Sequence, residues 1–223
     1  MKHGLIKAAC ASVEIRVADC GYNAKSILQA VDWAEQEGVS LLVLPELCVT
    51  GYTCSDLFFQ RALQRAALEA LLEIAEGPGD KDLLVLVGVP ILYGAKLYNC
   101  AAVLHRGKVL GVVPKTYLPN YNEFYEMRQF SPAMEETVQV KLGDGEVPMG
   151  RNLLFACREV PELVLGVEIC EDLWALEPPS THHAAAGATV IANLSASNEL
   201  VGKEEYRRKL VEGQSARLEC AYL

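Results

Sequence analysis

The sequence has 223 residues, of which 51% are apolar and 22% are charged, as in an ordinary globular protein. A formal net charge of -9, with no long run of Lys or Arg, argues against nucleic acid as a main partner. Lys7 and Glu14 interrupt the apolar start, which excludes a signal peptide there. No apolar stretch reaches the roughly 20 residues that span a bilayer. We therefore expect a cytoplasmic protein without a membrane partner.

Short apolar strands alternate with amphipathic helices in the first part of the chain. We predict a strand over 4–15, then a helix with an Asn23 N-cap that ends at Gly38. A strand over 40–47 and a helix over 56–76 follow. The strand over 40–47 is apolar throughout, which is typical of a sheet covered on both faces.

The middle of the chain predicts an antiparallel meander, and the last third returns to alternating strands and helices. The remaining predicted elements are strands over 82–92, 99–105, 108–114, 152–159, 163–170 and 189–195, helices over 182–186 and 204–218, and the opening of a strand at 219–223. The polar, aromatic loop 116–132 is long for a connection, and such loops tend to be functional. We expect one mixed α/β domain over 1–223, incomplete at its C-terminus.

Eight cysteines are present, but none forms a C-x-x-C pair, so the spacing favours neither a zinc site nor a thioredoxin-like site. Most are expected to be small packed hydrophobes. The spacing of Cys48 and Cys54 fits no redox motif. The pair His182-His183 has no matching ligand spacing, so we predict no metal site.

Three polar residues stand where apolar strands end: Glu46, Lys115 and Cys170. Strand ends in α/β sheets commonly carry catalytic groups. A cysteine can attack an amide carbonyl, and a carboxylate can take the thiol proton and pass it to the departing ammonia. A lysine ammonium can stabilise the oxyanion. Taken singly, each residue also fits a solvated strand end or a packed thiol.

The order Glu46, Lys115, Cys170, each in a PE, PK or IC context, resembles the Glu-Lys-Cys triad of the nitrilase (carbon–nitrogen hydrolase) superfamily. The resemblance implies a four-layer α-β-β-α sandwich. The segments 44–60, 114–130, 168–180 and 192–208 narrow the resemblance to the glutaminase domain of glutamine-dependent NAD synthetases.

This resemblance implies that Cys170 is the nucleophile, Glu46 the general base and acid, and Lys115 the oxyanion-stabilising cation. It also implies that Glu123 orients the lysine. The positions that surround glutamine in these enzymes correspond to Tyr52, Tyr121, Phe124, Glu171, Ser197 and Lys203. Glu171 has the chemistry to accept an α-ammonium, and Lys203 with Ser197 that to bind an α-carboxylate.

The implied partners are glutamine, a synthetase domain that is absent from this chain, and further copies in a homo-oligomer. The ammonia would amidate nicotinic acid adenine dinucleotide. ATP and magnesium are expected only for the synthetase domain, because the S-G-G-x-D-S type pyrophosphate loop does not occur here. No cofactor is expected in this chain.

Two other functions stay open from the sequence. One is a stand-alone nitrilase-superfamily amidase or carbamoylase acting on another small amide. The other is a non-catalytic α/β scaffold, in which Cys170 would be no more reactive than Cys100 or Cys157.

Overall fold

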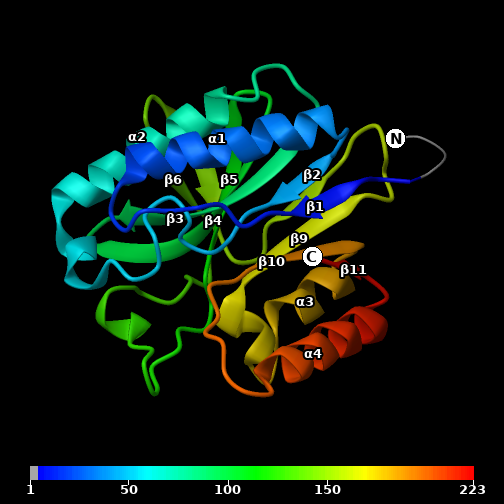
Figure 1. Cartoon of the computed structure of the whole chain (residues 1–223). Coiled ribbons are helices and arrows are strands. Elements are labelled where there is room, and N and C mark those ends of the chain that lie inside the picture. The colour runs from blue at the N-terminus through cyan, green and yellow to red at the C-terminus, as the bar shows by residue number, and fades with distance from the viewer. Residues whose placement is uncertain (1–4) are drawn as a thin grey trace.

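The computed structural model describes residues 5–223, whose strands form two sheets (Figure 1). The larger sheet has the order β1-β2-β3-β4-β5-β7-β6. Its strands are β1 Ala8–Cys10, β2 Leu41–Val43, β3 Leu84–Tyr93, β4 Lys96–His105, β5 Lys108–Pro114, β6 Val138–Leu142 and β7 Gly145–Met149. The smaller sheet has the order β11-β10-β9-β8. Its strands are β8 Leu154–Ala156, β9 Val164–Ile169, β10 Val190–Leu194 and β11 Ala221–Tyr222.

Helices cover the outer face of each sheet, so the predicted four-layer α-β-β-α sandwich is confirmed (Figure 1). Helices α1 (Cys20–Gln36) and α2 (Arg61–Glu76) pack on the larger sheet through an apolar core that includes Ile27 and Leu71. Helices α3 (Pro179–Ala185) and α4 (Lys203–Leu218) lie on the smaller sheet (Figure 1).

A second apolar core lies between the two sheets. It joins side chains of the larger sheet, such as Val103 and Val113, to Val167 and Ile169 of β9. All four are at most 2% exposed. Burial of each such side chain contributes about 1.5–3 kcal/mol. This core fixes the end of β9 against the ends of β2 and β5.

The predicted meander of β3, β4 and β5 is confirmed as two antiparallel pairs. The hairpin of β6 and β7 was not predicted; its turn at Gly143-Asp144 was the available signal. The first predicted strand is shorter than expected, because only Ala8–Cys10 pairs with β2. Its predicted start, residue 4, lies outside the described part of the chain. No helix within residues 5–223 is long and apolar enough to cross a membrane.

The prediction that Asn23 caps the first helix is wrong. Helix α1 begins four residues earlier than that cap implies, at Cys20, with the Asp19 carboxylate accepting from the Tyr22 N–H. The buried Asn23 amide instead bonds the backbone of Arg16 and Val49. It thereby ties the helix to the chain that follows β2.

Candidate active site

Glu46 lies three residues beyond the end of β2, in a turn that packs against β3. The backbone makes this approach at Gly88, where an added Cβ would stand 2.1 Å from the Leu47 nitrogen and 2.6 Å from the Glu46 carbonyl carbon. Glycine is therefore required at this position of β3. The turn directs the Glu46 carboxylate inward, and the residue is 2% exposed.

Lys115 follows the last residue of β5 and is fully buried. Its Nζ donates to Glu46 Oε1 at 2.7 Å and to Glu126 Oε1 at 2.7 Å. Burial disfavours the ammonium, but the carboxylates of Glu46 and Glu126 outweigh that effect and raise the pKa of Lys115. Lys115 is therefore a permanent cation at neutral pH.

Glu126 occupies the place that was predicted for Glu123. The prediction that Glu123 orients Lys115 is wrong in this structure, because the side chain of Glu123 is exposed and accepts a hydrogen bond from Asn198. A short 3₁₀ helix, Glu126–Arg128, turns Glu126 inward to 4% exposure. The segment NEFYE contains two glutamates, and spacing along an irregular loop cannot predict which of them reaches Lys115.

Two further groups hold the carboxylates. Asn99 Nδ2 donates to Glu46 Oε1 at 2.6 Å and to Glu126 Oε2 at 3.3 Å. The Tyr52 hydroxyl donates to Glu126 Oε1 at 2.6 Å. Burial raises the pKa of Glu126, and the nearby Glu46 carboxylate adds to the effect while Lys115 opposes it. Asn99 was missed in the sequence, although it is a buried amide within an apolar strand.

Cys170 begins the 3₁₀ helix Cys170–Trp174 directly after β9. Its φ of 46° lies in the left-handed region, which costs a non-glycine residue about 1–3 kcal/mol. Such strain persists only where the surroundings enforce it. The thiol is buried, and burial together with the Glu46 carboxylate raises the pKa of Cys170 to about 12, although Lys115 opposes them. The resting group is a thiol that needs a base.

The Asp172 carboxylate joins the segment around Cys170 to the loop after Lys115. It accepts N–H groups from Thr116 at 3.1 Å and Tyr117 at 2.7 Å, and from Ile169 at 2.9 Å. Strand ends of the two sheets are thereby locked together beside the thiol. Burial raises the pKa of Asp172 to about 8, against the opposite effect of these N–H groups.

Four of the residues predicted to surround the substrate, Tyr121, Phe124, Glu171 and Lys203, lie together beside this site. The Tyr121 hydroxyl donates to Glu171 Oε2 at 2.9 Å, and the Tyr121 ring packs edge-on against Phe124 at 5.8 Å. Lys203 Nζ lies 6.0 Å from the centre of the Phe124 ring and bonds Asn198. Half-buried Ser197 precedes Asn198. Tyr52, which was predicted to contact the substrate, instead donates a hydrogen bond to the buried Glu126 carboxylate.

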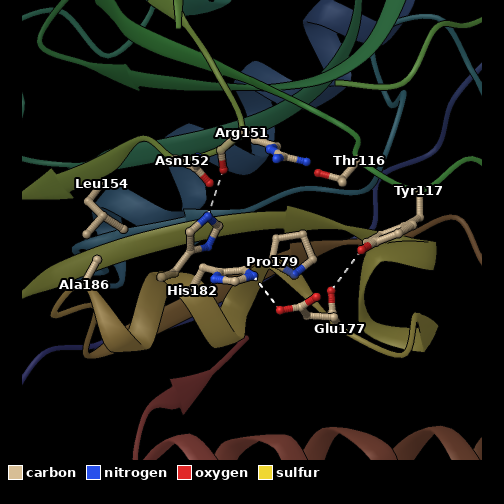
Figure 2. Close-up of a pocket in the computed structure, with 10 residues that line it drawn as sticks. Thr116, Tyr117, Arg151, Asn152, Leu154, Glu177, Pro179, His182 and Ala186 are labelled. Carbon is tan, nitrogen blue, oxygen red and sulfur yellow. Dashed lines mark hydrogen bonds and ion pairs between the residues drawn. The ribbon is translucent and has the colours of Figure 1, made fainter. Parts of the chain in front are cut away.

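A cavity of about 430 Å³ lies apart from these groups, between α3 and the turn at Arg151 (Figure 2). Figure 2 shows His182 reaching toward Glu177, with an Nε2 to Oε1 distance of 3.0 Å. His183 is buried and bonds the Arg151 carbonyl oxygen through Nε2. Burial lowers the pKa of His183, which keeps it neutral. The histidines diverge, and residues 5–223 contain no cluster of acidic, His or Cys side chains suited to a metal ion.

Comparisons with known proteins give the chain's relatives. Residues 7–218 match the family model of the carbon–nitrogen hydrolases. The glutamine-dependent NAD(+) synthetase of Mycobacterium tuberculosis is 42% identical over 222 residues, and that of Thermotoga maritima is 35% identical over 204. The match covers 100% of this chain with the first relative and 91% with the second. The chain spans about a third of each relative's length, 33% and 32% respectively.

Solved structures give the same relationship. A glutamine-dependent NAD(+) synthetase from Cytophaga hutchinsonii superimposes with a TM-score of 0.86 at 35% identity, over 97% of this chain and 35% of that one. An amidase from Nesterenkonia sp. has a TM-score of 0.71 at 20% identity, over 97% of this chain and 75% of that one. The second likeness concerns the fold alone.

Proposed function

The chain belongs to the carbon–nitrogen hydrolase family, and on that basis we propose that it hydrolyses glutamine to glutamate and ammonia. The observation that carries the proposal is the buried ion triplet of Glu46, Lys115 and Glu126 beside the strained Cys170. Burying three charged groups is costly unless each is paired, so such an arrangement is typical of a reaction centre.

The first half of the reaction starts from the neutral Cys170 thiol. Its Sγ attacks the γ-carbonyl carbon of glutamine while Glu46 takes the thiol proton. The carbonyl oxygen becomes an oxyanion, which Lys115 and the backbone N–H of Glu171 stabilise. Glu46 then gives the proton to the amide nitrogen, the carbon–nitrogen bond breaks, and ammonia leaves a γ-glutamyl thioester on Cys170.

The second half releases glutamate. Glu46 takes a proton from water, the hydroxide oxygen attacks the thioester carbonyl, and the carbon–sulfur bond breaks as Cys170 regains a proton. Glu46 Oε1 is held by Lys115 and Asn99, while Oε2 accepts, from residues 5–223, only the Ala196 N–H at 3.0 Å. Oε2 is therefore the oxygen available for both proton transfers.

The charged residues beside the site would favour glutamine over other amides. Glu171 would accept the α-ammonium of glutamine, and Lys203 would bind its α-carboxylate. Phe124 and Tyr121 supply apolar surface between them. A small amide without these charges would leave Glu171 and Lys203 unused, which disfavours the amidase alternative.

The relatives' name, together with the third of their length that the chain spans, supports a wider role. We propose that the ammonia serves a synthetase domain, which would use it for ATP-dependent amidation of nicotinic acid adenine dinucleotide. This chain would then supply the glutaminase step alone.

The test is steady-state glutaminase kinetics in the natural polypeptide that contains this sequence. Cys170→Ala should abolish glutamate release, and Glu46→Gln should lower kcat by about 10²–10⁴-fold. Lys115→Met should lower it by about 10²–10³-fold, the typical loss of an oxyanion partner. Cys157→Ser, a half-buried cysteine away from the site, is the matched control. Wild-type turnover of simple amides but not of glutamine would overturn the proposed substrate.

A further inference from the structure

The backbone N–H of Cys170 is bound by the side chain of Asn193, which lies on the neighbouring strand β10. The Cys170 N–H donates to Asn193 Oδ1 at 2.9 Å. Strands β9 and β10 pair in parallel up to Ile169 and Leu194, so Cys170 stands just past the last paired residue. Asn193 therefore supplies the acceptor at the point where the ladder ends and the strained residue begins.

The Asn193 amide oxygen also accepts from the Ser195 hydroxyl at 2.9 Å, and its amide nitrogen is fixed by two groups on the face of the smaller sheet that carries α3 and α4. Glu168 is the register partner of Asn193, and its Oε1 accepts from Asn193 Nδ2 at 3.4 Å. Tyr222 of β11 accepts from the same Nδ2 at 3.2 Å and donates to Glu168. Because both partners use the Nδ2 group, the amide can present only Oδ1 to Cys170.

Glu168 is anchored in turn. It is fully buried, and its second oxygen accepts the Ser180 N–H at 2.7 Å. Burial and the adjacent Glu168 carboxylate raise the pKa of the Tyr222 hydroxyl, so that hydroxyl remains a donor across the neutral range. A buried carboxylate with this set of donors is a rigid acceptor. None of these three side chains takes part in the proton transfers proposed above.

We propose that Asn193, Glu168 and Tyr222 form a positioning network that holds the Cys170 backbone in the strained conformation from which its thiol meets Glu46. The proposal rests on the proposed function only for its kinetic readout. The network acts through the Cys170 N–H and contacts no substrate atom. It also connects β11, near the end of the described chain, to the nucleophile.

The sharpest test exchanges the amide at position 193 and the carboxylate at position 168. In Asn193→Asp, two carboxylates face one another and Nδ2 is lost, so kcat should fall by at least about 30-fold with KM changed less than threefold. Combining it with Glu168→Gln restores a donor–acceptor pair in which the three side-chain bonds among positions 168, 193 and 222 are reversed, while the Cys170 and Ser180 N–H groups still donate. The introduced glutamine amide would donate to Tyr222, whose hydroxyl would donate to the introduced aspartate. The double variant should recover most of kcat.

Tyr222→Phe keeps the test independent of whether the charge variants fold. Loss of one hydroxyl should lower kcat by about three- to tenfold without a matching change in KM or in the thermal unfolding temperature. Tyr98→Phe is the matched control, since Tyr98 is buried in the core of the larger sheet and has no side-chain hydrogen bond within residues 5–223. It should leave kcat unchanged.

A second readout separates this proposal from the proposed function. The rate at which iodoacetamide alkylates Cys170, followed by peptide mapping, needs no glutamine. It should fall in Asn193→Asp and recover in the double variant even if the natural substrate is another amide. Unchanged kcat and alkylation in folded Tyr222→Phe and Asn193→Asp would overturn the network. So would a double variant no better than Asn193→Asp alone.

Discussion

At the scale of single residues, the site contains two buried carboxylates and one buried ammonium. Glu46 and Glu126 both contact one ammonium, Lys115, so two carboxylates share a single cation. Asn99 is a neutral donor to both carboxylates, and Tyr52 is a neutral donor to Glu126. Burial and the carboxylate of Glu46 raise the pKa of Glu126, so this group is protonated at a higher pH than an ordinary glutamate.

The pH profile of kcat/KM should report this pair. As the pH falls, Glu126 takes up a proton above the ordinary glutamate range, Lys115 loses a charged partner, and kcat/KM declines. Glu126→Gln should lower the plateau by about 10- to 100-fold, because a hydrogen bond to a charged group contributes about 1.5–3 kcal/mol. It should also move the acid limb to lower pH, since the carboxyl group whose raised pKa sets that limb is gone.

Glu123→Gln is the matched control for that profile. Its carboxylate is exposed and bonded to Asn198, so its removal should leave the position of the acid limb unchanged. If Glu123→Gln shifts the acid limb of the pH profile and Glu126→Gln does not, Glu126 is not the partner of Lys115 that sets this limb. The profiles would be measured with glutamine below its KM.

The candidate catalytic residues that the sequence predicted are those at the ends of apolar strands. Glu46, Lys115 and Cys170 could be found because a strand's direction predicts where the next side chain lies. Glu126 could not be separated from Glu123, because the loop between them follows no fixed period. The contact of Asn193 with the Cys170 amide depends on strand register, which one sequence does not determine.

At the scale of elements, the site depends on how closely the turn after β2 approaches β3. The Glu46 and Leu47 backbone crosses Gly88 at a distance that excludes a Cβ, and Leu47 itself has a φ of 51°. The apolar run over 40–47 predicted one long strand, but its paired part is only Leu41–Val43. The remaining residues turn so that Glu46 enters the interior.

Gly88→Ala should therefore lower kcat, although the substitution adds only one methyl group. Forcing a methyl group against backbone atoms costs about 1–3 kcal/mol of stability or more. The turn must shift, so kcat should fall while the overall secondary structure remains. Circular dichroism, thermal unfolding and glutaminase kinetics would measure these effects together.

Gly21→Ala is the control for this change. Gly21 is an exposed helical glycine of α1 with no atom near its added Cβ, so this substitution should leave stability equal or slightly improved. Full activity in Gly88→Ala would contradict the proposed role of the close approach.

Tertiary contacts also explain where element boundaries were misjudged. Asp19 and Asn23 both suit an N-cap, and the chain uses Asp19 because the Asn23 amide bonds Arg16 and Val49. Those partners are distant from the helix pattern that a sequence displays. The meander of β3, β4 and β5 was predictable because its turns and apolar runs are local.

At the scale of the whole molecule, the site exists only where the two sheets meet. Glu46 and Lys115 come from the larger sheet, and Cys170 comes from the smaller one. The inter-sheet core and the Asp172 carboxylate fix these strand ends against each other. The layers were predictable from the resemblance of long motifs, whereas the bonds that lock the layers together were not.

The central claim is that this assembly makes Cys170 alone a nucleophile toward a glutamine-shaped electrophile. The most direct measurement is peptide mapping by mass spectrometry after treatment of the folded protein with 6-diazo-5-oxo-norleucine. We expect a single adduct on Cys170, slowed by excess glutamine and lost in Glu46→Gln and Lys115→Met, with none on buried Cys48 or Cys100. Equal labelling of several cysteines, or a Cys170 adduct that survives both substitutions, would contradict the account.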